Sequence, residues 1–305
     1  LIAPPVFADD CTRLCDWEFM KTATAQDIQA EINKGADIEA RNKWGTTPLH
    51  SAAATGNAEA VAALLQAGAD IEARAEGGYT PLHLAARLGN AEAVAALIEA
   101  GANIEARNED GFTPLHEAAN DGNAEAITVL LQAGANIEVR SEGGFTPLHG
   151  AANAEAVTAL IEAGADIKAR TEGGKTPLYV TVVRGNAEAV TALIGAGADI
   201  DARDKDGFTL LHIAAILGKA EAVTALIEAG ADIDAREKGG FTPLHGAALL
   251  GNAEAVIALL QAGADIEARA EDGDTPLHVA AAWGKAEAIT TLIKAGANGK
   301  AKNKD

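Results

Sequence analysis

Histidine is the residue type in this chain best suited to acid–base or metal chemistry, and all seven histidines share one sequence context. Each stands fourth in Thr-Pro-Leu-His or a close variant, at His50, His83, His116, His149, His212, His245 and His278. Neighbouring histidines lie at least a whole repeat apart, too far to share a metal ion. No nucleophile or orienting acid recurs beside them, as catalysis would require. The histidines therefore predict a structural role, and we expect no enzyme activity, no metal and no cofactor.

Two other motifs imitate ligand-binding loops. Gly173-Gly174-Lys175-Thr176 resembles the end of a phosphate-binding loop, but Ala169 stands where that motif needs its first glycine. Asp204-Lys-Asp-Gly207 resembles the start of a calcium loop, but Ala215 occupies the place of the bidentate glutamate. We interpret both segments as turns.

The chain has two cysteines, Cys11 and Cys15. On a helix, this spacing places the Cα atoms about 6 Å apart, within the range of a disulfide. The spacing excludes a redox Cys-x-x-Cys motif, and the absence of a nearby histidine makes a zinc site unfavourable. A disulfide between Cys11 and Cys15 is predicted, with a pair of free thiols as the alternative.

Residues 1–8, LIAPPVFA, do not match the rest of the chain. Val6 and Ala8 would be the small residues at positions −3 and −1 of a signal-peptide cleavage site before Asp9. Together with the cysteine pair, this pattern predicts an exported protein, periplasmic or extracellular. The alternative is an apolar leader of an internal fragment. No apolar run reaches the length of about 18 residues that suggests a membrane span, so we expect no membrane insertion.

The elements that carry the histidines recur at a fixed period. The threonine that opens each copy lies at 47, 80, 113, 146, 176, 209, 242 and 275, so the spacing is 33 residues except for one step of 30. A period of this size is typical of a stacked solenoid. The 305 residues therefore predict one elongated array instead of separate globular domains.

One copy can be interpreted residue by residue. Thr47 is a favourable N-cap, and Pro48 follows at the first helical position. Gly56 ends this short helix, and Asn57 caps a second one. Residues 69–74 then alternate in polarity, which predicts an extended arm ending in a two-residue hairpin turn that contains glycine.

These motifs closely resemble the ankyrin repeat. The resemblance rests on Thr-Pro-Leu-His, Gly-Asn-Ala-Glu-Ala-Val and Gly-Ala-Asp-Ile-Glu-Ala-Arg and covers roughly residues 16–298. It implies an all-α solenoid of stacked helix–turn–helix units with protruding β-hairpin fingers, about nine repeats including a divergent N-terminal cap. Partners of that family usually dock on the concave face formed by the first helices and the fingers.

The resemblance gives a division of the chain. Residues 1–8 would be the signal remnant, 9–45 a capping repeat with the cysteine pair, 46–299 eight repeats, and 300–305 a basic, solvated tail. The repeat near 146–166 lacks three residues between its helices, and Thr181-Val182 replaces an alanine pair in the next. This irregularity indicates either a bend or soft joint near 150–185 or neutral drift.

The charge restricts the partners. The chain has 44 acidic and 24 basic side chains and a net charge of −20, which disfavours nucleic acid and anionic membranes as partners. Solubility alone could also account for this charge. In each arm, glutamate and arginine lie two residues apart, as in Glu72 and Arg74. Stacking such arms predicts a ladder of ion pairs between repeats.

Candidate binding residues occupy positions that the scaffold does not require. These are the residue after each finger glycine and the two residues before each inter-helix glycine. In the C-terminal half they form an apolar set: Phe208, Ile216, Leu217, Phe241, Leu249, Leu250 and Trp283. In the N-terminal half they include Tyr79, Arg87, Leu88, Phe112 and Phe145.

Exposed apolar strips mark docking sites, and aromatic anchors supply much of the binding energy. The alternative is that these side chains are buried against one another. The sequence thus predicts a monomeric scaffold that binds a protein partner on its concave face. The competing hypothesis is a structural spacer, or a stabilising factor for an envelope enzyme, that has no dedicated docking site.

Overall fold

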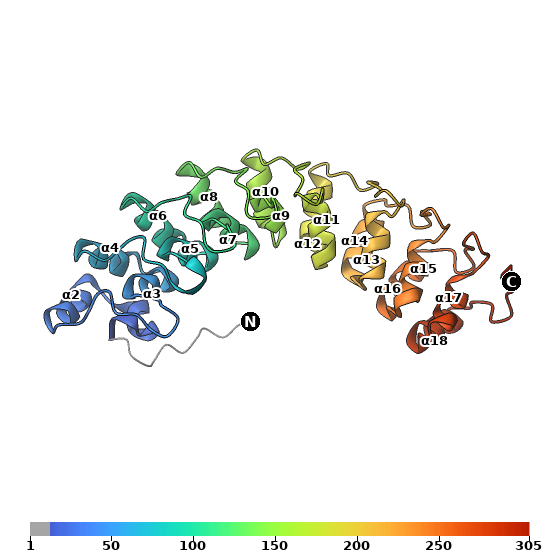
Figure 1. Ribbon diagram of the computed structural model, residues 1–305, viewed down its shortest axis with the longest axis horizontal. Coiled ribbons are helices and arrows are strands. Elements are labelled where there is room, and N and C mark those ends of the chain that lie inside the picture. Colours follow the sequence, from blue (N-terminus) through green and yellow to red (C-terminus); the bar gives the residue numbers. More distant parts are fainter. Residues whose placement is uncertain (1–12, 305) are drawn as a thin grey trace. The chain divides into compact units, whose positions relative to one another are not determined.

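The computed structural model describes residues 13–304. The predicted signal remnant and Cys11 lie outside the described residues. The chain folds into two compact units, residues 1–174 (unit 1) and 175–305 (unit 2), and we describe each by itself. Figure 1 shows successive helix pairs in each unit.

Unit 1 contains five helix pairs and two short 3-10 helices among its described residues. In chain order these are η1 (Arg13–Cys15), α1 (Trp17–Thr22), α2 (Ala25–Asn33), α3 (Pro48–Thr55), α4 (Ala58–Gln66), η2 (Glu76–Gly78), α5 (Pro81–Arg87), α6 (Ala91–Glu99), α7 (Pro114–Asn120), α8 (Ala124–Gln132), α9 (Pro147–Gly150) and α10 (Ala154–Glu162).

Unit 2 contains four pairs. They are α11 (Pro177–Arg184), α12 (Ala187–Gly195), α13 (Leu210–Ile216), α14 (Ala220–Glu228), α15 (Pro243–Leu250), α16 (Ala253–Gln261), α17 (Pro276–Ala282) and α18 (Ala286–Lys294). In both units odd-numbered helices pack on odd-numbered ones and even on even, which gives two layers. The predicted helix-pair solenoid of nine repeats is confirmed.

The core lies between these layers and is built from small and branched side chains. In α3 and α4, for example, Leu49, Ala52, Val61 and Leu64 are completely buried. Alanine at the contact positions lets helices approach closely, and leucine and valine fill the remaining space. A single repeat could not bury both layers, so the packing depends on its neighbours.

In the repeats that carry it, the recurring histidine links one repeat to the next. The backbone N–H of Thr47 donates to His50 Nδ1 at 3.2 Å, so Nδ1 carries no proton. The Nε2–H of His50 then donates to the carbonyl oxygen of Tyr79 in the following finger, at 3.0 Å. The same pair of bonds recurs at His83, His116, His212 and His245. The predicted structural role is confirmed, and it extends to the adjacent repeat.

An asparagine at the start of the second helix makes another link. The Asn90 Nδ2 group donates to the carbonyl oxygens of Ala53 and Ala54, at 2.9 and 2.8 Å, at the end of the preceding repeat's first helix. Gly56 leaves room for this side chain, because a Cβ there would lie 2.8 Å from Asn90 Oδ1. Asn57, Asn123 and Asn252 make equivalent bonds.

The fingers differ from the prediction. The arm is not extended, because Asp70 Oδ1 accepts from the Glu72 N–H at 3.0 Å and makes a tight turn within it. Among residues 13–304 the hairpins contain no strand, only an isolated bridge between Arg203 and Thr209. Local side-chain bonds of aspartate therefore override the alternating pattern.

The predicted ion-pair ladder is also wrong. The Nη1 group of Arg74 donates to the carbonyl oxygens of Gly78 and Arg107, at 3.1 and 2.8 Å, and the Glu72 carboxylate accepts from the Asn103 N–H at 2.7 Å. Both side chains thus satisfy backbone groups of the next arm and not each other. Because the arm turns at Asp70, the side chains of Glu72 and Arg74 bind different partners.

Both ends of the array depart from the regular repeat. At the start, Thr24 and Asp27 form a capping box at the N-terminus of α2. At the other end, the Lys304 N–H donates to the Asp272 carbonyl oxygen at 3.1 Å, and the Lys302 carbonyl accepts from Arg269 at 2.8 Å. The predicted solvated tail is therefore bound along the last finger, although its lysine side chains are exposed.

The three-residue deletion falls in the first helix of its repeat. α9 has only four residues, and Ala151 leaves the helix in a non-helical conformation. The chain then passes directly into α10, which keeps the full length of nine residues. The division between the two units follows one finger later, at Gly174.

Candidate protein-docking surface

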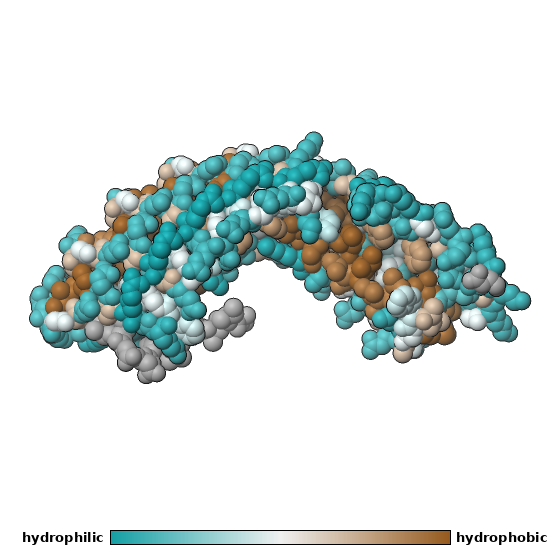
Figure 2. Space-filling model, viewed as in Figure 1, coloured by the Kyte–Doolittle hydropathy of each residue, from teal (hydrophilic) through white to brown (hydrophobic). Residues whose placement is uncertain are grey.

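In unit 2 the predicted binding residues lie on or directly beside three adjacent helices. α13 packs on α15, and α15 on α17. Leu217, Leu250 and Trp283 stand at the same place in these successive repeats, with 44, 48 and 66% of each residue exposed. We define the apolar strip as these three residues with Phe208, Ile216, Phe241 and Leu249, which are half-buried. Figure 2 shows apolar surface over this unit.

The aromatic residues of the strip also belong to the scaffold. The Phe241 ring meets the His245 ring edge to face, with centroids 5.1 Å apart, and Phe208 contacts His212 at 5.5 Å. Phe208 and Phe241 are therefore partly buried within the scaffold, as the alternative hypothesis predicted in part. Both residues are half-buried, so each ring packs against its histidine and the residue stays partly exposed.

Ile216 is positioned by a glycine of the neighbouring helix. A Cβ built on Gly246 in α15 would lie 2.8 Å from Ile216 Cγ1, so only glycine accommodates this side chain. Glycine inside a helix costs about 1 kcal/mol relative to alanine. In return, Gly246 allows α13 and α15 to pack closely near Leu217 and Leu250.

The predicted binding residues of unit 1 form a more polar surface. Leu88 is 51% exposed. Beside it, Arg87 Nε lies 3.6 Å from Asp121 Oδ2, and the Arg87 guanidinium carbon lies 5.8 Å from the centre of the Tyr79 ring. Phe112 and Phe145 pack against His116 and His149 as the aromatic residues of unit 2 do.

Two polar residues of unit 1, Asn108 and Glu117, escaped the sequence analysis. Asn108 Nδ2 donates to Glu117 Oε1 at 3.1 Å, and both residues are buried. Burial raises the pKa of the Glu117 carboxyl, and it also raises the pKa of Asp121. The sequence did contain a signal for this buried contact, because Glu117 is a charged residue directly after the recurring histidine. In the first full repeat Ser51 takes that place, and the equivalent Asn42 Nδ2 has no hydrogen-bond partner.

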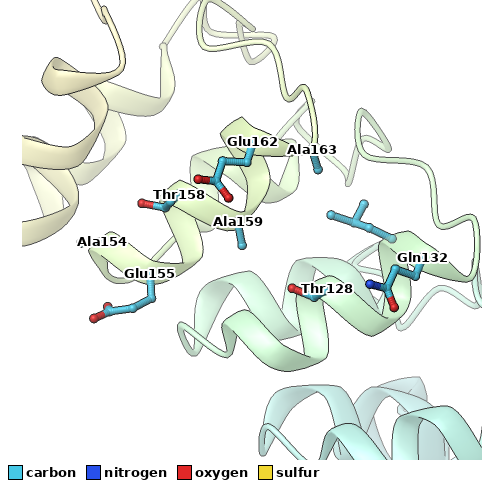
Figure 3. A pocket seen from close by; sticks show the side chains of 9 residues that line it. Thr128, Gln132, Ala154, Glu155, Thr158, Ala159, Glu162 and Ala163 are labelled. Carbon is cyan, nitrogen blue, oxygen red and sulfur yellow. The ribbon is translucent and has the colours of Figure 1, made fainter.

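A separate groove of about 770 Å³ lies between α8 and α10. Figure 3 shows Thr128 and Gln132 of α8 on one side and Thr158, Ala159 and Glu162 of α10 on the other. The groove belongs to the layer of second helices and contains none of the predicted binding residues. Its lining includes no histidine or cysteine.

The described residues offer no arrangement for metal chemistry. Across 13–304, no cluster of three His, Cys, Asp or Glu side chains could hold a metal ion. In that same span, no helix is both long and apolar enough to cross a membrane. The predicted pairing of Cys11 with Cys15 stays a prediction, because Cys11 lies outside the described residues.

The stacked helix pairs and their fingers define a repeat solenoid with exposed side chains at the variable positions. The model of the family described as ankyrin repeats (3 copies) matches residues 21–108, 102–171, 151–237 and 234–303. The chain therefore belongs to the ankyrin-repeat family, whose repeats are generally protein–protein interaction modules. A comparison with curated proteins found no match.

Proposed function

We propose that this chain is a non-enzymatic scaffold that binds another protein through the apolar strip of unit 2. The observation that supports this function is the exposure of Leu217, Leu250 and Trp283 at one place in three successive repeats. Exposing large apolar side chains to water is unfavourable, and a repeated apolar patch is a feature of interaction surfaces. The stacked repeats hold these anchors rigidly, which lowers the entropy lost on binding.

Photocrosslinking tests this function. A photoreactive phenylalanine analogue at Leu250 should crosslink to a partner in an extract of the native host. The same analogue at Ile257, which is 42% exposed on α16 of the same repeat, is the matched control. A partner captured only from Leu250 supports the proposal. A folded protein that captures nothing from Leu250, or the same products from both sites, favours the spacer hypothesis.

We also propose that the protein is exported and carries a Cys11–Cys15 disulfide. The proposal rests on the sequence pattern of residues 1–15 alone. Mass spectrometry of the protein from its native host tests both parts. The expected product begins at Asp9 and has two hydrogens fewer than the dithiol form. An N-terminus upstream of residue 9 or two alkylatable thiols would contradict the corresponding part.

A further inference from the structure

We propose that two copies of this chain associate through the outer face of their last helix pairs. The contact uses a surface other than the apolar strip, so it goes beyond the proposed function and does not depend on it. Such a dimer replaces the monomer expected from the sequence.

The outer side of the last pair of unit 2, α17 and α18, keeps the residues that join one repeat to the next (Figure 1). Ala281 is exposed, whereas Ala248 at the same position of the preceding repeat is completely buried. Ile289 is half-buried, whereas its equivalent Val256 is completely buried. These positions therefore face the following repeat wherever one is present. We define the end face as Leu277, Ala281, Ile289 and Ile293, the last of which is 54% exposed.

The finger side of the last pair is covered by the C-terminal tail. His278 Nε2–H donates to the Ala301 carbonyl oxygen at 3.0 Å, and Arg269 Nη1 donates to the Lys302 carbonyl oxygen at 2.8 Å. These bonds are the ones that a following finger accepts in the regular repeats. Among residues 13–304, however, no further helix pair covers the end face. The open part of this surface is thus helical and apolar.

The first helix pair ends the array differently. In the second helix of the last pair, Ala288 and Leu292 are completely buried. The first pair has no preceding repeat among the described residues, and there the same positions hold Asp27, which is exposed, and Glu31, which is half-buried. A polar outer face is what keeps the end of a repeat array soluble. The end face has no such substitution, so it presents a repeat–repeat interface without its partner.

The charge around the end face favours a second copy as the occupant. Helix α17 contains no Asp, Glu, Lys or Arg, and α18 contains only Glu287 and Lys294. Their equivalents in α4, Glu59 and Gln66, are exposed although a repeat follows, so these two positions lie outside the repeat–repeat interface. Two end faces can therefore meet about a two-fold axis without burying like charges. Ala281 lets the helices approach closely, as alanine does within the array.

Stacking of the end face on the first pair of another copy is disfavoured. That arrangement would bury the carboxylates of Asp27 and Glu31 against apolar side chains, and burying a charge without a partner is costly. A two-fold contact between end faces instead buries apolar surface from both copies, which is favourable. The pairing is thus closed and yields a dimer and not a filament.

Sedimentation velocity of the full 305-residue chain tests the association. Each chain has a mass of 31.0 kDa, and the wild-type protein should sediment with twice that mass and dissociate on dilution. Ala281→Lys and Ile293→Lys each place a charge in the contact of both copies and should weaken dimerisation at least about ten-fold. Both residues are exposed in the single chain, so the fold should be retained, and a thermal melt checks this.

Two matched variants change exposed apolar residues elsewhere in unit 2. Ile257→Lys on α16 and Leu250→Asp in the apolar strip should leave the dimer intact. A photoreactive phenylalanine analogue at Ile293, in a mixture of unlabelled and nitrogen-15-labelled chains, then identifies the contact. The expected crosslink joins α18 of one copy to the last helix pair of the other.

Each outcome decides the inference. A wild-type protein that stays monomeric at every concentration overturns it, as does a dimer that survives both end-face substitutions. Loss of the dimer in Leu250→Asp alone, or a crosslink from Ile293 to α2, also overturns it, because the contact would then lie elsewhere. These measurements contain no other protein, so their failure leaves the docking function standing, and a failure of docking leaves the dimer standing.

Discussion

At the scale of single residues, the histidines act as hydrogen-bonded links and not as reactive groups. Burial lowers the pKa of His50, His83 and His116 from 6.5 to about 4, and it also lowers the pKa of His212 and His245. The geometry agrees with these directions. Protonation would place a hydrogen on Nδ1, which already accepts the backbone N–H of the preceding threonine.

These histidines predict acid-sensitive stability. Their folded pKa values lie below the unfolded value, so the unfolded chain binds more protons between about pH 6.5 and pH 4. The free energy of unfolding should therefore be fully retained above pH 6.5 and decrease as the pH falls toward 4. Urea titrations across this range measure the change, and NMR of the imidazole protons follows the groups directly. Titration of these rings near pH 6.5 in the folded protein would contradict the assignment.

At the scale of helices and fingers, hydrogen bonds from side chains to backbone groups join the repeats. Asn90 and its equivalents bind the ends of the first helices, and the arginines bind carbonyl oxygens of adjacent arms. Both contacts recur at the repeat period, so one local geometry is used many times. The repeats depend on these links because each buries its core only against its neighbours.

Asn90→Ala tests the first of these links. The substitution removes the donor from two carbonyl groups and should cost about 1–3 kcal/mol of unfolding free energy. Chemical denaturation measures the loss, and Gln66→Ala on exposed α4 surface serves as the matched control. A loss no larger than that of the control would show that water replaces the asparagine without penalty.

Position 72 distinguishes the observed finger contacts from an ion-pair ladder. Glu72→Gln retains an acceptor for the Asn103 N–H, so the unfolding free energy should change by less than about 0.5 kcal/mol. Glu72→Ala removes the acceptor and should cost about 0.5–1.5 kcal/mol. Denaturation at low and high salt provides the measurement. Equal losses in both variants, relieved by salt, would instead indicate a charge-dependent contact.

The helix ends could be predicted from the sequence because a few residues in each repeat determine them. Thr47, Pro48 and Gly56 specify helix ends through their own backbone preferences, and the capping box at Thr24 is equally local. The arm was mispredicted because the side chain of Asp70 bonds its own backbone, which an alternating pattern does not reveal. The second bond of each histidine and the asparagine links join residues about one repeat apart, so inspection of a single repeat could not find them.

The sequence located the candidate binding positions but not the surroundings of their side chains. Leu250 and Trp283 are 48 and 66% exposed, so neither fills the core, and their role in binding stays a prediction. The sequence could not show that the Phe241 ring would pack against His245, or that Glu117 would be buried against Asn108. Those outcomes depend on which neighbouring residues the stacking places alongside.

At the scale of the whole molecule, the two units have different surfaces. Residues 1–174 carry 26 acidic and 11 basic side chains, whereas 175–305 carry 18 and 13. The net negative charge is thus concentrated in unit 1, and the apolar strip belongs to the less charged unit. A high net charge favours solubility, so the charge of unit 1 would offset the exposed apolar strip of unit 2.

The affinity of the crosslinked partner, once purified, tests the docking function most directly. Isothermal titration calorimetry would compare the wild-type chain with Leu250→Asp and with Ile257→Asp, two exposed apolar residues of one repeat. The account predicts that Leu250→Asp weakens binding by at least about 30-fold, the loss of a binding hot spot, while Ile257→Asp changes it less than about three-fold. Equal affinities for wild type and a folded Leu250→Asp protein would contradict it.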